Sequence, residues 1–131
     1  MTQAIDNKGL KIETLKKRSD FLRIAGVGRK WVTPAVIVQT CENSVADGNF
    51  IRVGYTASKK VGNAVMRNRA KRRLREAARQ VMGFSASKNH DYVLIARSQI
   101  ADIKFKELIR DLKWALKRLH KSAEKSGSEN N

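Results

Sequence analysis

The sequence predicts a single α+β domain, a two-layer α–β sandwich in which helices pack against one small sheet. Two observations favour this class: segments with helical periodicity are interleaved with short β-branched runs, and the longer helical segments carry an apolar stripe to bury. A chain of 131 residues, 41% of them hydrophobic, is long enough for one core and too short for two. We expect one domain over 1–131, with an ordered core over about 14–120 and mobile tails at 1–10 and 122–131.

The first element expected is a short helix over Ser19–Ala25. The Ser19 side chain can cap the N–H groups of the first turn, and Gly26 or Gly28 can end the helix. Leu15, just before this helix, is expected to anchor the chain as it enters.

Two strands are expected next. Trp31–Cys41 is rich in β-branched residues, and Pro34, the only proline, suits the beginning or edge of a strand. Residues 43–49 have the composition of a turn, and Phe50–Ala57 then alternates between two faces. We therefore predict an antiparallel pair with one apolar and one polar face.

A long helix, an interior strand and a closing helix complete the domain. The predicted long helix, Asn63–Met82, has an apolar stripe made of Met66, Ala70, Leu74, Ala77 and Val81. Asp91–Ala96 is short and apolar, as expected of a strand inside a sheet. Ile103–Leu119 carries a second narrow apolar stripe, and Trp114 falls on the other side of that helix.

Positive charge is concentrated in Ser58–Arg79. The basic residues of this segment are Lys59, Lys60, Arg67, Arg69, Lys71, Arg72, Arg73, Arg75 and Arg79, against the single acid Glu76. Surface helices ordinarily mix the two signs, and the arginine fork matches phosphate oxygens. Together with a formal net charge of +16, this pattern indicates a helix that packs with one side and binds a polyanion, most simply nucleic acid, with the other.

The residues that precede the long helix, Ser58–Asn63, are suited to binding an anion. Gly62 permits a tight turn from strand to helix, Asn63 can cap the helix, and the exposed N–H groups there favour phosphate. We predict a phosphate or metal-bridged phosphate site at Gly62 and Asn63. The glycine and Lys-Ser/Thr spacing of a Walker-type nucleotide site is missing.

The sequence contains no set of residues suited to catalysis by the protein alone. His90 and His120 lie far apart, and the acids are scattered rather than paired for two-metal phosphodiester cleavage. Cys41 is the only cysteine, so no disulfide or cysteine-based metal site is expected. Neither a membrane span nor a secretory signal is recognisable. We expect a cytoplasmic protein that binds no membrane, holds no metal of its own and needs no organic cofactor.

These motifs resemble a known family. The block RVGYTASKKVGNAVMRNRAKRRLREAAR, with Arg67-Asn68-Arg69 in it, closely resembles the signature of the bacterial ribonuclease P protein subunit. The resemblance extends to LKKRSDFLRI upstream and DYVLIAR downstream, over about residues 14–120. It implies a ribosomal-protein-S5-like sandwich of three helices and a small mixed sheet of about four strands, with the long helix in an uncommon left-handed βαβ crossover.

The resemblance also implies a function. The family's protein subunit assists a catalytic RNA that removes 5′ leaders from precursor tRNA. The endonuclease is the complex of RNA and protein, and its Mg²⁺ ions are bound mainly by the RNA. The implied partners are that RNA and precursor tRNA, with no obligate protein partner. The residues implied to bind RNA are Lys59, Lys60, Arg67, Asn68, Arg69, Lys71, Arg72 and Arg75. Those implied to contact the single-stranded leader, in a cleft between the first helix and the sheet, are Phe21, Ile37, Thr56 and Lys60.

Two positions depart from the family pattern. A second aromatic residue often follows Phe21 by one helical turn, but here that position is Ala25, and an often aromatic sheet position is Gln39. Stacking on leader bases is therefore expected to be weaker, or shared with Trp31. For Phe21 and Trp31 alike, packing in the core is the commoner role.

Two other functions stay open. One is a ribosomal or general RNA-binding protein with the same basic helix. The other is a DNA-binding regulator. A helix-turn-helix regulator would have a helix just before its recognition helix, whereas here strands precede the arginine helix.

Overall fold

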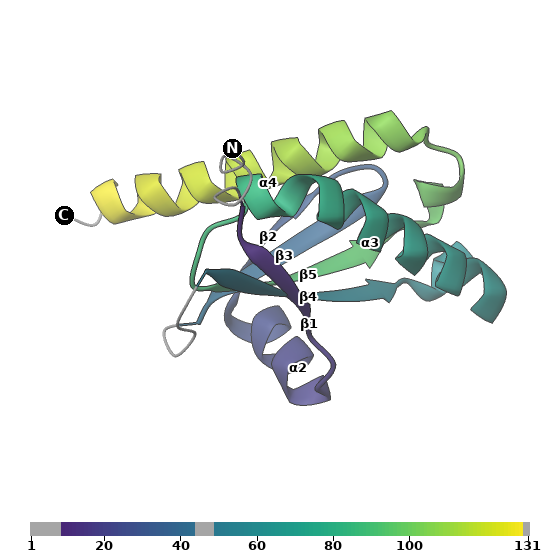
Figure 1. The fold of residues 1–131 in the computed structure, drawn as a ribbon, viewed down its shortest axis with the longest axis horizontal. Coiled ribbons are helices and arrows are strands. Elements are labelled where there is room, and N and C mark those ends of the chain that lie inside the picture. Colours follow the sequence, from purple (N-terminus) through teal and green to yellow (C-terminus); the bar gives the residue numbers. More distant parts are fainter. Residues whose placement is uncertain (1–8, 44–48, 130–131) are drawn as a thin grey trace, which may run out of the picture.

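The computed structural model describes residues 9–43 and 49–129, without the side chains of Val27 and 122–129. Its strands form a five-stranded mixed sheet in the order β1-β4-β5-β3-β2. The elements in chain order are β1 (Lys11–Thr14), α2 (Arg18–Val27), β2 (Arg29–Val32), β3 (Val36–Glu42), β4 (Phe50–Ala57), the 3₁₀ turn η1 (Lys59–Val61), α3 (Ala64–Ser85), β5 (His90–Ala96), the 3₁₀ turn η2 (Ser98–Ala101) and α4 (Phe105–Glu129). Helices α3 and α4 cover one face of the sheet, and α2 lies on the other (Figure 1). The predicted α+β class with three helices is confirmed, with five strands instead of about four.

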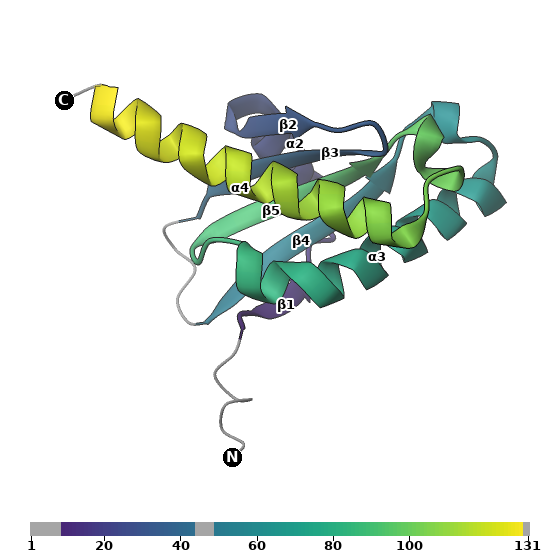
Figure 2. The ribbon, with the colours of Figure 1, turned by 90° about the horizontal axis from the view of Figure 1, so that it is seen from above.

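The connection β4–α3–β5 is a left-handed crossover. Strands β4 and β5 are parallel neighbours. In Figure 2, which looks onto the helices, both strands point to the right, β5 lies above β4, and α3 crosses on the viewer's side of the sheet. A right-handed crossover would place β5 below β4 in this view. The family resemblance implied this uncommon handedness, and it is confirmed.

The predicted antiparallel pairing of Trp31–Cys41 with Phe50–Ala57 is wrong. The first run is a hairpin, because Thr33 closes a turn in which its hydroxyl donates to the Val36 carbonyl at 2.7 Å, and Pro34 lies in that turn. Strand β3 pairs with β2 and β5, and β5 lies between β3 and β4. The crossover through α3 places β5 between β3 and β4. The alternation of apolar and polar residues within one strand does not reveal which strand will be its neighbour.

Several helix ends differ from the prediction. Helix α2 begins after Lys17 without a side-chain cap, so Ser19 lies inside it, and the N–H of Gly28 closes its C-terminus by donating to Ile24 O at 2.9 Å. Helix α4 continues past the expected end at Leu119. Strand β1, which pairs in parallel with β4, was not expected. The parts of the predicted tails at 1–8 and 130–131 lie outside the described residues.

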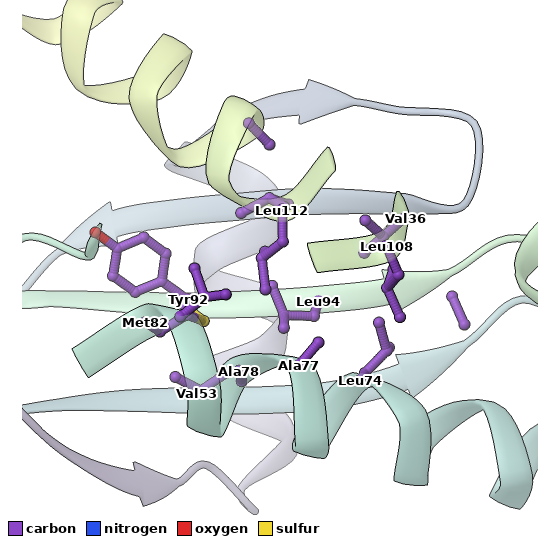
Figure 3. Packing of buried hydrophobic residues seen from close by; sticks show 14 of the residues in the cluster. Val36, Val53, Leu74, Ala77, Ala78, Met82, Tyr92, Leu94, Leu108 and Leu112 are labelled. Atoms are coloured by element: carbon purple, nitrogen blue, oxygen red, sulfur yellow. The ribbon is translucent and has the colours of Figure 1, made fainter. Parts of the chain in front are cut away.

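The main core lies between the sheet and the two long helices. The α3 stripe packs on the strands and on α4, with Leu74, Ala77 and Ala78 facing Val53, Leu94 and Leu108 (Figure 3). Of the predicted stripe only Met66 is not buried, with 42% of its surface exposed, because it lies in the first turn beside Gly62 rather than over the sheet. As predicted, Leu15 is buried; it belongs to a second cluster, on the α2 side. The core thus fixes α3 with its charged side outward.

Candidate nucleic-acid interface

The turn before α3 holds a defined conformation that presents two lysines. The Ser58 N–H donates to Ala96 O at 3.0 Å, and the Ser58 hydroxyl accepts from the Lys60 N–H at 3.2 Å. Gly62 has φ +140°, and a Cβ there would lie 2.5 Å from Met66 Sδ, so only glycine fits. The predicted cap is present: Asn63 Oδ1 accepts from the Met66 N–H at 2.9 Å. Lys59 and Lys60 are exposed beside this cap.

Six cations at this turn and on the first half of α3 have no partner within the described part of the chain. They are Lys59, Lys60, Arg67, Arg69, Lys71 and Arg72, whose side chains form no ion pair there. The exposed Asn68 lies among them. We call these seven residues the α3 surface. The structure therefore brings together seven of the eight predicted RNA-binding residues, with no carboxylate among them to neutralise their charge.

The other three arginines of α3 have partners within the protein. Arg73 donates to the carbonyls of Ile100 and Ile103, the latter at 2.8 Å, and so ties η2 to the helix. Arg79 pairs with Glu76. Arg75, the eighth predicted RNA-binding residue, is exposed but lies over the ring of Tyr55, 5.4 Å from its centroid. Burial raises the pKa of Tyr55 to about 12, and the charge of Arg75 opposes that rise.

A pocket of about 300 Å³ adjoins the α3 surface. Apolar side chains of α3 and η2 line it, together with Arg69 and Arg73. Arg73 forms part of the pocket wall and is held there by its hydrogen bonds to Ile100 O and Ile103 O, whereas Arg69 belongs to the α3 surface. Positive charge and an apolar hollow therefore meet at the first turns of α3.

The residues predicted to contact a leader lie on the opposite, α2 side of the sheet or next to it. Phe21 packs on β4 where Gly54 leaves room: a Cβ on Gly54 would lie 2.5 Å from Phe21 Cζ. Ile37 and Thr56 both pair with Ile95, so they flank it in one row across three strands. Lys60 is exposed in η1, three residues after the end of β4. The structure thus brings Phe21, Ile37 and Thr56 to the α2 face, and Lys60 follows β4 in the turn before α3.

Trp31 is not available to share stacking with Phe21. In the β2–β3 register Trp31 pairs with Val38, which is buried in the core beneath the long helices. Trp31 packs against that core on the α4 side, and the guanidinium of Arg118 lies 5.2 Å from its ring centroid. The expectation of a shared role is wrong, because alternation along β2 places Trp31 on the other face of the sheet.

A buried carboxylate, which sequence reasoning missed, fixes α2 on the sheet. Asp91, 1% exposed, accepts hydrogen bonds from Arg23 of α2 at 2.5 Å, from Arg52 of β4 at 3.0 and 2.7 Å, and from Asn43 at 3.2 Å. Burial raises the pKa of Asp91, but hydrogen bonds from Arg52, Arg23 and Asn43 outweigh it, and the pKa is lowered. Arg23, Asn43 and Arg52 are far from Asp91 in sequence, so no local sequence pattern predicts the cluster.

The described residues offer neither a cluster of metal ligands nor a membrane-spanning helix. No three His, Cys, Asp or Glu side chains gather as metal ligands would in the part of the chain that the structure describes. Of the helices described, none is both long and apolar enough to cross a bilayer.

Comparisons with known proteins agree on one family. The family model for ribonuclease P matches residues 10–120. The ribonuclease P protein component of Paramagnetospirillum magneticum is 49% identical over 111 residues, covering 83% of this chain and 84% of that protein. That of Ruegeria pomeroyi is 50% identical over 110 residues, covering 83% and 87%.

Solved structures agree with the sequence comparisons. The ribonuclease P protein of Thermotoga maritima superposes with a TM-score of 0.68 at 30% identity, over 81% of this chain and 96% of that one. The protein of Staphylococcus aureus does so with a TM-score of 0.64 at 32% identity, over 79% and 92%. The chain belongs to the ribonuclease P protein family.

Proposed function

We propose that this chain is the protein subunit of ribonuclease P, which binds the catalytic RNA and the 5′ leader of precursor tRNA and assists Mg²⁺-dependent removal of the leader. The holoenzyme is the endoribonuclease, it works in the cytoplasm, and the RNA carries out the hydrolysis. The observation that carries this proposal is the α3 surface of unpaired cations, in a chain that belongs to this family.

The α3 surface suits the RNA backbone for electrostatic reasons. Exposed or half-buried cations without carboxylate partners are available for phosphates, and each phosphate contact releases condensed counterions. Arginines add paired donors that match phosphate oxygens. The cap at Asn63 and the fixed turn at Gly62 hold the lysines beside the helix N-terminus, where phosphate is favoured.

The α2 side suits an unpaired strand. Phe21 offers a ring for base stacking, and the row of Ile37, Ile95 and Thr56 offers an apolar strip with one hydroxyl. Lys60 belongs to both regions, so it can contact a leader that passes from one to the other. With Ala25 and Gln39 at the two other positions, Phe21 is the one aromatic ring among the residues proposed to contact the leader.

The residues of this chain do not fit a magnesium site held by protein. Mg²⁺ prefers carboxylates, water and phosphate oxygens, whereas the α3 surface is cationic and Asn63 Oδ1 already accepts the capping hydrogen bond. We therefore assign Mg²⁺ to the RNA, and we derive no step from a metal on the protein.

Reconstitution at low magnesium tests this proposal. The chain is added to the cognate ribonuclease P RNA, and cleavage of precursor tRNA at the mature 5′ end is measured across magnesium concentrations. We expect the protein to restore correct cleavage where the RNA alone is inactive. Absence of stimulation at every magnesium concentration would overturn the proposal. Co-sedimentation with ribosomal subunits, or equal affinity for duplex DNA and structured RNA, would point to the other two functions.

A further inference from the structure

A second basic surface lies on the outer side of α4, next to α3 in the helical layer (Figure 2). Lys106, Arg110, Lys113 and Lys117 follow one another at about one cation per helical turn. With Trp114 they line a shallow depression of about 410 Å³. Within the described residues, the only carboxylate paired with any of the four is Asp111, 3.9 Å from Arg110. We call these four cations and Trp114 the α4 surface.

Trp114 is exposed but held in place. Half of its surface, 51%, is open to solvent, although a ring of this size is ordinarily buried. The guanidinium of Arg118 lies 5.6 Å from the Trp114 ring centroid and 5.2 Å from that of Trp31 on β2. Arg118 therefore joins both rings by cation–π contacts and links Trp114 to the edge of the sheet. A ring fixed in this way loses little freedom when a planar group stacks on it.

We propose that the α4 surface is a second RNA-binding site, which takes an unpaired segment with one base stacked on Trp114 and the backbone along the four cations. The ribonuclease P function does not require this site, because the α3 surface and the α2 side already account for the two ligands proposed above. The chemistry follows the usual composition of single-strand sites: an aromatic platform inside a row of cations.

An anionic membrane fits this surface less well than RNA does. A helix that lies in a membrane interface buries an apolar face between the lipids. The apolar face of α4, with Leu108, Leu112 and Leu116, is buried in the protein core. Trp114 and the half-buried Ile109 are the apolar side chains that line the depression.

Fluorescence gives a direct test of the stacking. Trp31 and Trp114 are the two tryptophans of the chain, so Trp31→Phe leaves Trp114 as the single reporter. Oligoadenylate is titrated into this variant and into the same variant with Arg69→Ala and Arg72→Ala, which weaken the α3 surface. We expect quenching of Trp114 in both proteins. Binding of the oligonucleotide without any change in Trp114 emission would overturn the proposal, as would quenching only by phosphatidylserine vesicles.

Variants with the native Trp31 provide an independent readout. Trp114→Ala should weaken oligoadenylate binding by about 5- to 100-fold and leave its salt dependence unchanged, while Trp114→Phe should retain most of the affinity. Lys113→Gln with Lys117→Gln should instead lower the slope of log affinity against log salt by about 1.4, two single-strand phosphate contacts. Phe84→Ala, at a side chain 73% exposed and outside this surface, is the matched control. Equal effects of Trp114→Ala and Phe84→Ala would refute a site at Trp114.

These outcomes separate the α4 site from the proposed function. If Trp114→Ala weakens oligoadenylate binding but still stimulates precursor tRNA cleavage at low magnesium, the α4 surface is a second site. Stimulation of cleavage together with unquenched Trp114 would refute the α4 site and leave the ribonuclease P function standing.

Discussion

Replacing Asp91 by alanine is expected to destabilise the protein by about 3 kcal/mol. Removing one partner of a buried ion pair typically costs about 3–5 kcal/mol, because the remaining charge is left without compensation. Here the remaining charges are Arg23 and Arg52, whose side chains are 36% and 30% exposed. Water can partly solvate both arginines, so we expect the lower end of that range. For a chain of this length the loss corresponds to a melting temperature lower by roughly 10 °C.

The pH dependence gives this prediction a second, independent signature. The pKa of Asp91 in the folded protein lies below its ordinary value of 3.8, so the folded state favours the carboxylate. The stability that Asp91 contributes is therefore complete above the unfolded pKa and is lost as the pH falls through the lower folded pKa. Asp91→Asn, which keeps the shape and removes the charge, should lack this part of the acid-induced loss.

Urea unfolding followed by circular dichroism, from neutral pH down to below pH 3.8, measures both effects. The matched control is Glu76→Gln, which breaks the exposed pair with Arg79 and should leave unfolding unchanged, because exposed pairs contribute little. Two results would show that Asp91 does not hold α2 on the sheet. One is that Asp91→Ala unfolds at the same urea concentration as Glu76→Gln. The other is that Asp91→Asn loses as much stability at low pH as the wild type does.

Three further changes test the geometry. Gly62→Ala should cost about 1–3 kcal/mol of unfolding free energy, since φ is +140° there; Gly26→Ala, with nothing within 4 Å of the added Cβ, should be neutral or stabilising, and equal effects would contradict the strained turn. Gly54→Ala should displace the Phe21 ring and weaken binding of precursor tRNA relative to mature tRNA; an unchanged ratio would remove Phe21 from the leader site. The difference in tyrosinate absorbance between wild type and Tyr55→Phe should have its midpoint near pH 12, and the stability due to the neutral ring should fall as pH rises from about 10 to that value. A midpoint at the ordinary value would show that the half-burial of Tyr55 does not raise its pKa.

Features that repeat along one helix could be predicted from the sequence. The division of α3 into a buried stripe and a charged side needs only the helical period, and the cap at Asn63 needs only a strand-to-helix turn. Met66 is the exception, because periodicity cannot tell where a helix extends beyond the sheet it covers.

Features that depend on strand order and long-range pairing could not be predicted in this way. The position of β5 between β3 and β4 follows from the crossover, and it brings Asp91 beside Arg52. Arg73 resembles the free arginines in sequence, but the fold brings it to the carbonyls of Ile100 and Ile103. The family resemblance supplied the handedness of the crossover, which no single-sequence pattern contains.

The salt dependence of binding to the ribonuclease P RNA tests the central claim, that the unpaired cations of the α3 surface contact its backbone. Arg69→Ala with Arg72→Ala is compared with Arg79→Ala, which removes an arginine of the same helix that is already paired with Glu76. We expect the double variant to bind more weakly and to lower the slope of log affinity against log salt by about 1.4–1.8, and Arg79→Ala to leave the slope nearly unchanged. An unchanged affinity and slope in the double variant, or an equal loss per arginine in Arg79→Ala, would contradict the assignment of the α3 surface to the RNA.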